Sequence, residues 1–151
     1  MAMTMNGEVM LAATPQTVWE KLNDPETLKA CIPGCEQLDK LSDTEMQAVA
    51  TVKIGPVKAR FKGKVTLSDL DPPNGYKISG QGDGGVAGFA KGGATVKLTP
   101  KDGGTLLAYD VDAQIGGKLA QLGQRLVNGA AKKVADDFFA NFAAAVNPKA
   151  A

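Results

Sequence analysis

Residues 118–146 read KLAQLGQRLVNGAAKKVADDFFANFAAAV, the longest helical pattern in the chain. Apolar side chains recur in this stretch at steps of three and four, which predicts one continuous helix with a buried stripe. The stripe comprises Leu119, Leu122, Leu126, Ala130, Val134, Phe138 and Phe142. The helix is expected to end near Val146, before a stop at Asn147 and Pro148. Another large apolar surface of the protein is needed to bury this stripe.

The preceding residues supply that surface as a series of strands with one apolar face. The clearest strand is 57–67, which places Val57, Ala59, Phe61, Val65 and Leu67 on one side and Lys58, Arg60, Lys62 and Lys64 on the other. Similar alternation predicts strands at 3–11, 36–41, 45–54, 76–78, 94–99 and 107–115. After the first strand, Thr14-Pro15 and Asp24-Pro25 each predict the start of a short helix.

Short turns between the later strands, such as DPPNG at 71–75, indicate hairpins and therefore an antiparallel sheet. One helix cannot cover seven strands unless the sheet curls around it. The sequence therefore predicts an α+β helix-grip fold: a seven-stranded antiparallel curved sheet around a long C-terminal helix, with two short helices after strand 1. We expect a single domain spanning residues 1–151.

Composition excludes several classes of function. The chain has 151 residues, a net charge of +1, two cysteines and no histidine. Without histidine there is no Ser-His-Asp or Cys-His activation and no His-ligated metal, so we predict neither catalytic nor metal-binding residues. The balanced charge favours no nucleic acid partner. No secretory leader or apolar run long enough to span a bilayer is found, which predicts a cytoplasmic protein.

Small side chains are unusually common on the surfaces that should face each other. Gly123, Ala130 and Ala135 lie on the predicted helix, and Ala50 and Ala94 lie on inward strand faces. Two interpretations stay open: helix and sheet approach closely, or a space remains between them. An open space would be an apolar pocket with the hydroxyls of Tyr76 and Tyr109 as its main polar atoms, suited to a hydrocarbon or aromatic ligand.

Two glycine-rich motifs lie between residues 80 and 93. Gly80, Gly82 and Gly85 match the G-x-G-x-x-G fingerprint of dinucleotide sites, but no helix follows them, so a flexible hairpin loop is the preferred interpretation. The segment GFAKGG at 88–93 lacks a phosphate-loop Gly-Lys-Ser/Thr and suggests a bulged strand. A bulge would leave open whether Phe89 points into the interior.

Both cysteines lie in CIPGC at 31–35, where the spacing fits neither a metal tetrad nor a redox C-x-x-C pair. A rigid helix-to-strand turn is the preferred interpretation, with redox sensing or a partner contact as alternatives. The row Lys58, Arg60, Lys62 and Lys64 is typical of a solvated sheet face, although it also suits an anionic lipid surface or an acidic protein.

Four segments, IPGCEQLD, GPVKARFKGKV, GFAKGGATVKL and GGKLAQLGQRL followed by FFANF, resemble the family of the G subunit of carbon monoxide dehydrogenase, within the START-like (SRPBCC) superfamily. The resemblance implies a START-like domain in a bacterial accessory protein that works with an aerobic carbon monoxide dehydrogenase or a related molybdenum hydroxylase. It also implies quinone handling in an apolar pocket and peripheral association with the inner face of the cytoplasmic membrane. No covalently bound cofactor is implied.

Three hypotheses follow. The leading one is a non-enzymatic protein that binds a quinone or lipid, with Tyr109 donating a hydrogen bond to a carbonyl; its pocket residues would be Phe61, Val65, Ile78, Phe89, Val96, Tyr109, Val111, Leu122, Leu126 and Ala130. The second is an interaction module with a filled core that docks through the basic row and the 80–93 loop. The third is an enzyme that uses an inward acid or Tyr109 as catalyst.

Overall fold

In the computed structural model, which describes residues 1–146, the strands and helices follow the order expected from the sequence. The stop expected at Asn147 and Pro148 lies outside the described residues. The strands are β1 (Ala2–Leu11), β2 (Cys35–Lys40), β3 (Glu45–Ile54), β4 (Val57–Asp71), β5 (Gly75–Asp83), β6 (Phe89–Lys101) and β7 (Gly104–Gly116). The helices are α1 (Pro15–Leu22), α2 (Pro25–Cys31), α3 (Lys118–Gln121) and α4 (Gln124–Val146), and a 3₁₀ turn, η1 (Gly85–Ala87), joins β5 to β6.

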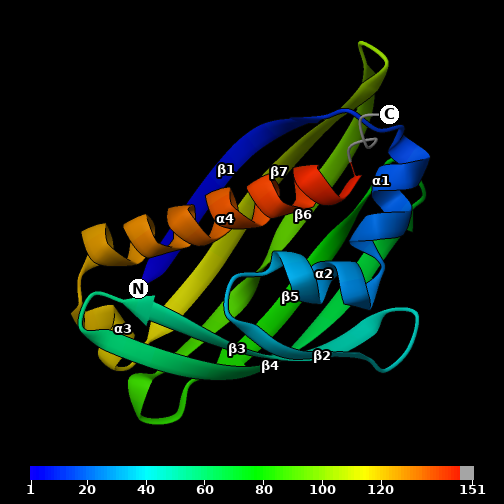
Figure 1. Cartoon of the computed structure of the whole chain (residues 1–151). Coiled ribbons are helices and arrows are strands. Elements are labelled where there is room, and N and C mark those ends of the chain that lie inside the picture. The colour runs from blue at the N-terminus through cyan, green and yellow to red at the C-terminus, as the bar shows by residue number, and fades with distance from the viewer. Residues whose placement is uncertain (147–151) are drawn as a thin grey trace.

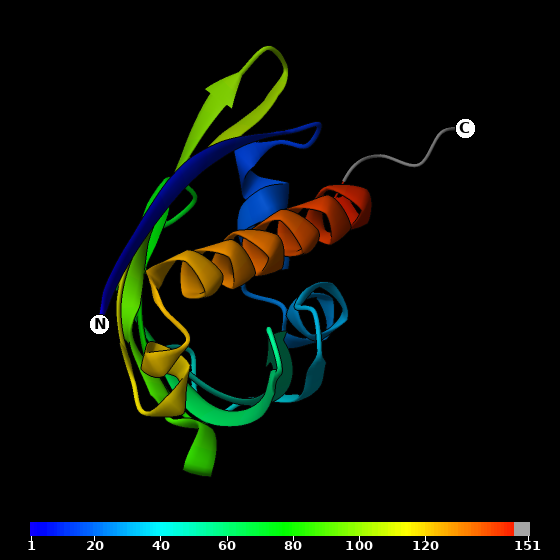
Figure 2. The same ribbon diagram turned by 90° about the vertical axis from the view of Figure 1, so that its left-hand side faces the viewer.

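All seven strands form one antiparallel sheet in the order β1-β7-β6-β5-β4-β3-β2. Hairpins between consecutive strands build most of it, and β7 then pairs with β1. The sheet curls around α4, which crosses its concave side, while α1 and α2 cover one end of that side (Figures 1 and 2). The helix-grip fold predicted from the sequence is confirmed.

The alternation of β4 fixes which way each strand faces. Ala59 and Leu67 are buried on the concave side, whereas Lys58 and Lys64 are exposed on the outer side. Register with β3 continues the same faces, because Ala59 pairs with Val52. A shift of one residue would turn every apolar side chain of the strand outward, so the hydrophobic pattern holds the register.

The two short helices begin at the expected caps. The Thr17 amide donates to the Thr14 hydroxyl at 3.3 Å, and Pro15 occupies the first turn of α1. Asp24 caps α2: its carboxylate accepts from the Thr27 hydroxyl at 2.6 Å, which holds the pKa of Asp24 below its usual range. Both caps satisfy amides that an open helix end leaves unpaired.

The CIPGC segment forms the expected turn. Helix α2 ends at Cys31 and β2 begins at Cys35, with Gly34 between them at φ +74°. A side chain on Gly34 would strike the carbonyl oxygen of Thr51. Both cysteines are free, and burial raises the pKa of both thiols, so they stay protonated at neutral pH.

The glycine-rich segment is mostly strand, whereas a flexible hairpin loop was expected. β5 and β6 pair without a register shift from Gly75↔Lys97 to Asp83↔Phe89, so the bulge suggested for 88–93 is absent. Only 84–88 connect the two strands. Unbroken alternation points Phe89 to the outer face, where it is 40% exposed and lies over Gly116. The prediction that Phe89 lines the pocket is therefore wrong.

The C-terminal helix is broken, also contrary to expectation. Gly123 adopts φ +94° between α3 and α4, and this left-handed residue resets the helical phase. Leu119 before the break is 1% exposed and Val127 after it is 4% exposed, whereas Leu126 is 45% exposed. The continuous stripe predicted through Leu126 is therefore wrong at that position.

Replacing Gly123 by alanine should lower the free energy of unfolding by about 1–2 kcal/mol, because an L-residue is strained in the left-handed region. Gly129→Ala is the matched control, since Gly129 lies inside α4 with open space around it, and it should raise stability by about 0.5–1 kcal/mol. Urea unfolding followed by circular dichroism measures both. Equal stabilisation by the two alanines would contradict the break.

Candidate functional site

The buried core is divided into two separate clusters. Val18 and Phe142, both 0% exposed, belong to the cluster under α1, α2 and the end of α4. Leu119 and Val127 belong to the cluster at α3 and the start of α4. At 1.5 Å per residue, Val127 and Phe142 lie about 22 Å apart along α4. A single helix thus connects two cores.

A cavity of about 530 Å³ lies between these clusters and is lined by members of both. Small side chains line it where larger ones would fill it: Ala130, Ala131 and Ala135 on α4, and Ala48, Ala90 and Ala94 on the sheet. Of the two interpretations of the small residues, the open space is therefore the one found. Its volume is within the range of small-molecule sites.

The lining is almost entirely hydrocarbon. It contains no acidic, basic or thiol side chain, and its hydroxyl groups are those of Tyr76 and Tyr109. Binding of an apolar molecule to such a surface is favourable, and the surface offers few groups for proton transfer.

The two tyrosines differ in where their hydroxyls lie. Tyr109 pairs with Gly7 on β1, and its hydroxyl lies over Gly7, where any side chain would collide with it. Its ring stacks on Phe139 with centroids 4.9 Å apart. Tyr109 also borders an outer groove between β1 and α4 that contains Lys132. The ring thus lines the cavity, while the hydroxyl sits at the seam with β1.

Seven of the predicted pocket residues line the cavity: Phe61, Val65, Ile78, Val96, Tyr109, Val111 and Ala130. The other three, Phe89, Leu122 and Leu126, are not among its lining residues. Leu122 is half-buried against the second cluster. Each of these three differences from the prediction has a local cause. Phe89 faces outward because β6 has no bulge, and the two leucines are displaced from the helical stripe by the break at Gly123.

Other lining residues were absent from the predicted set. Met3, Met5, Val52 and Ile54 line the cavity from β1 and β3, and their period-two pattern was sufficient to find them. Phe139 had no such signal, because it stands beside Phe138 and off the helical stripe. Both rings reach the lining because the curved sheet surrounds α4 on more than one side (Figure 2).

The end of β3 borders the cavity without a neighbouring strand on its free edge. β2 pairs with β3 only between Met46 and Ala50, and the Thr51 amide donates to the Gly34 carbonyl oxygen at 2.9 Å, which leaves residues 52–54 of β3 without a backbone partner on that edge. Val52 of β3 and Val134 of α4, both half-buried, line the cavity. In Figure 2 no helix or strand lies between the end of β3 and the first half of α4.

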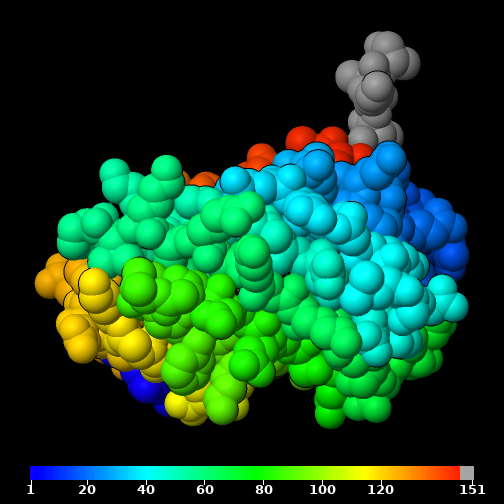
Figure 3. Space-filling model, turned by 90° about the horizontal axis from the view of Figure 1, so that it is seen from below, coloured from blue at the N-terminus to red at the C-terminus, as the bar shows by residue number. Residues whose placement is uncertain are grey.

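The basic row lies on the outer face of β4, as expected, on the side of the molecule seen in Figure 3. Two of its charges are compensated: Arg60 pairs with Glu36 at 2.9 Å and Lys64 with Glu45 at 2.8 Å. The Arg60 hydrogen bond holds the pKa of Glu36 below its usual range. Lys58 instead faces another cation.

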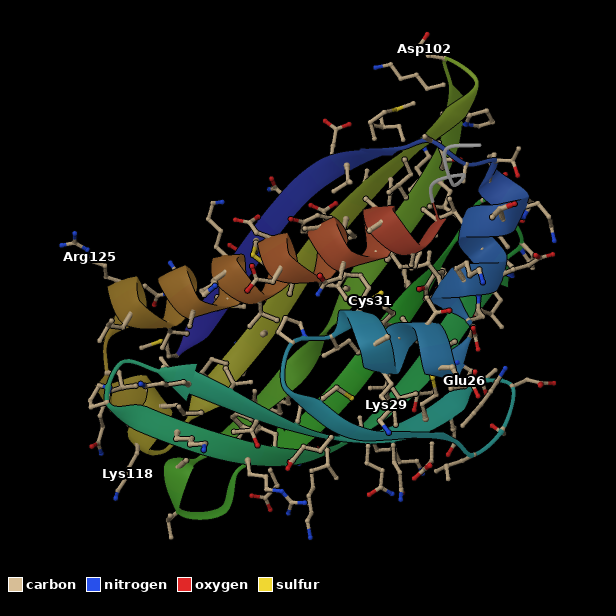
Figure 4. All side chains as sticks on the ribbon, viewed as in Figure 1. Glu26, Lys29, Cys31, Asp102, Lys118 and Arg125 are labelled. Atoms are coloured by element: carbon tan, nitrogen blue, oxygen red, sulfur yellow. The ribbon has the colours of Figure 1, made fainter. Side chains whose placement is uncertain are left out.

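Uncompensated positive charge gathers at the β3–β4 turn. Lys58 pairs in register with Lys53, and like charges directly opposite are unfavourable. Lys118 and Arg125 project outward from α3 and the start of α4 at the same end (Figure 4). Across residues 1–146, none of these four cations forms an ion pair.

Two further properties concern metals and membranes. In the part of the chain that the structure describes, no three Cys, Asp or Glu side chains come together to hold a metal ion. No helix within residues 1–146 has the length and apolar character needed to cross a bilayer.

Comparison with known proteins gives one family and many solved structures. The profile of the CoxG family, described as the G subunit of carbon monoxide dehydrogenase, matches residues 7–147. A conserved protein from Geobacillus kaustophilus is 35% identical, with 95% of each chain covered and a TM-score of 0.89. No curated protein matches the chain.

More distant structures show the fold alone. A START superfamily protein from Mycobacterium smegmatis is 16% identical, with 95% of this chain and 96% of that chain covered and a TM-score of 0.71. The Zhui aromatase/cyclase from Streptomyces sp. R1128 is 12% identical, with 97% and 94% covered and a TM-score of 0.72. The START-like fold expected from the sequence is confirmed.

Proposed function

Because the chain belongs to the CoxG family of carbon monoxide dehydrogenase, we propose that it is a non-catalytic accessory protein that holds a quinone or a similar apolar lipid in its cavity. The observation that carries this proposal is the cavity itself, about 530 Å³ with an almost wholly hydrocarbon lining. Burial of apolar ligand surface against such a lining is favourable by about 25 cal/mol per Å². Occupation by an apolar ligand is therefore expected, and it should stabilise the folded protein.

The chemistry of the lining supports binding rather than turnover. General acid–base catalysis needs a group that titrates near the working pH, and the lining contributes only two phenols. The inward acid considered in the enzymatic hypothesis is not among the lining residues. The likeness to an aromatase/cyclase is at 12% identity and concerns the fold.

The family description supports a partner of the carbon monoxide dehydrogenase type. We propose that the protein works beside such a molybdenum hydroxylase and carries its quinone between that enzyme and the membrane. A protein that encloses an apolar redox molecule shields it from water while it moves between the two, which would link the hydroxylase to the respiratory chain.

Filling the cavity should abolish ligand binding without unfolding the protein. Ala94 lies on the cavity floor, so Ala94→Phe places a ring in the void and should weaken quinone binding at least tenfold while thermal stability is kept or raised. Quenching of Trp19 fluorescence reports binding, because Trp19 contacts Tyr76 of the lining at 5.3 Å between ring centroids.

Thr95→Phe is the matched control for this substitution. Thr95 is the next residue of β6 and is exposed on the outer face, so the same ring there should leave quinone affinity unchanged. Unaltered binding to Ala94→Phe would place the ligand outside the cavity and remove the basis of the proposal.

We further propose that the end of the molecule around the β3–β4 turn docks on an anionic lipid surface. Exposed apolar side chains accompany the free cations here. Leu126 is 45% exposed and its side chain lies beside Gly55 of the β3–β4 turn, and Val86 on η1 is 87% exposed. Cations interleaved with apolar side chains suit a bilayer interface better than a purely polar protein face.

Charge reversal distinguishes this docking end from the rest of the basic row. Lys53→Glu with Lys58→Glu should weaken cosedimentation with vesicles containing phosphatidylglycerol at least tenfold, because each basic residue near such a surface contributes about 1 kcal/mol. Arg60→Glu with Lys64→Glu changes the net charge equally and should have a smaller effect, since these cations already have acidic partners. An equal loss in both pairs, or none in either, would contradict the assignment.

A further inference from the structure

Tyr76 is the most deeply enclosed polar side chain of the cavity lining. It lies on β5 opposite Val96 of β6 and is 6% exposed. The Trp19 ring packs edge-on against it at 83°. Its other neighbours belong to the first hydrophobic cluster, so the phenol is surrounded by hydrocarbon.

The Tyr76 hydroxyl has no hydrogen-bond partner within the described residues, and Tyr76 is a lining residue of the cavity. Buried hydroxyls are normally paired, as the fully buried Thr105 shows by donating to the Ala13 carbonyl oxygen at 2.7 Å. A nearly buried donor without a protein partner is costly unless a bound molecule accepts from it.

Tyr109 does not provide an equivalent group. Its hydroxyl lies over Gly7 at the β1 seam, beside the outer groove that Lys132 also borders. Burial raises the pKa of Tyr76 far above its ordinary value, so this phenol remains a hydrogen-bond donor throughout the neutral range.

We propose that the Tyr76 hydroxyl donates a hydrogen bond to the polar head of the bound ligand and so sets its orientation. The head then lies under α1 and α2 beside Trp19, and the apolar remainder extends past Ala94 and Ala130 toward the second cluster. The ligand class is an apolar molecule with a hydrogen-bond acceptor, such as a quinone carbonyl, at one end. This inference rests on the proposed function and assigns the polar contact to a residue other than Tyr109.

The test compares two probes that differ only in their carbonyl groups: a dimethylnaphthoquinone with no free ring position for thiol addition, and the corresponding dimethylnaphthalene. Calorimetric titration of wild type, Tyr76→Phe and Tyr109→Phe gives the affinities. Tyr76→Phe should weaken quinone binding about five- to tenfold and leave hydrocarbon binding unchanged, whereas Tyr109→Phe should weaken quinone binding less than Tyr76→Phe does.

Two further measurements separate a hydrogen bond from a structural effect. Tyr76→Phe removes a hydroxyl that no protein group needs, so its melting temperature without ligand should equal or exceed that of wild type. The infrared carbonyl stretch of the bound quinone should be lowered in wild type and should return toward its value in an apolar solvent in Tyr76→Phe.

The outcomes keep the two proposals distinguishable. If wild type and Tyr76→Phe bind the quinone equally, or if only Tyr109→Phe weakens it, the assignment to Tyr76 is overturned while the cavity remains a binding site. If wild type binds neither probe, the proposed function and this inference both fall.

Discussion

The position of α4 across the concave side of the sheet is the constraint on which the cavity depends. Each end of the helix is tied down: the Gln124 side-chain amide donates to the Ala2 carbonyl oxygen at 3.1 Å, and the Asn141 amide donates to the Cys31 carbonyl oxygen at 3.0 Å. Large apolar side chains, including Val127 and Phe142, pack beneath both ends. Between them the helix carries alanines that are too short to reach the sheet, so the middle stays open.

Most of this architecture could be predicted from the sequence because strands with one buried face have a period of two. The faces of β3 and β4, the caps at Thr14 and Asp24, and the turn at Cys31–Cys35 all follow from local patterns. Predictions were wrong where one residue changed the phase. Gly123 takes a left-handed conformation that turns Leu126 outward, and helical periodicity contains no sign of it.

The cavity itself was beyond sequence patterns, since small residues on facing surfaces permit either close packing or a void. Which one forms depends on how the large side chains at the two ends of α4 pack against strands that are distant in the sequence. The same limit applies to the tyrosines. Alternation places Tyr76 and Tyr109 inside, but only the three-dimensional structure shows that the Tyr109 hydroxyl lies over Gly7 while Tyr76 packs within the first hydrophobic cluster.

Ligand binding by this protein requires the space beneath the middle of α4 to be open. Crystals of the ligand-free protein under xenon pressure test whether this space exists. Xenon binds in apolar voids and does not enter tightly packed cores. Ordered xenon between the Val127 and Phe142 clusters, against Ala94 and Ala130, is the result we expect. Absence of xenon there, with these alanines packed in van der Waals contact across the helix–sheet interface, would contradict the account.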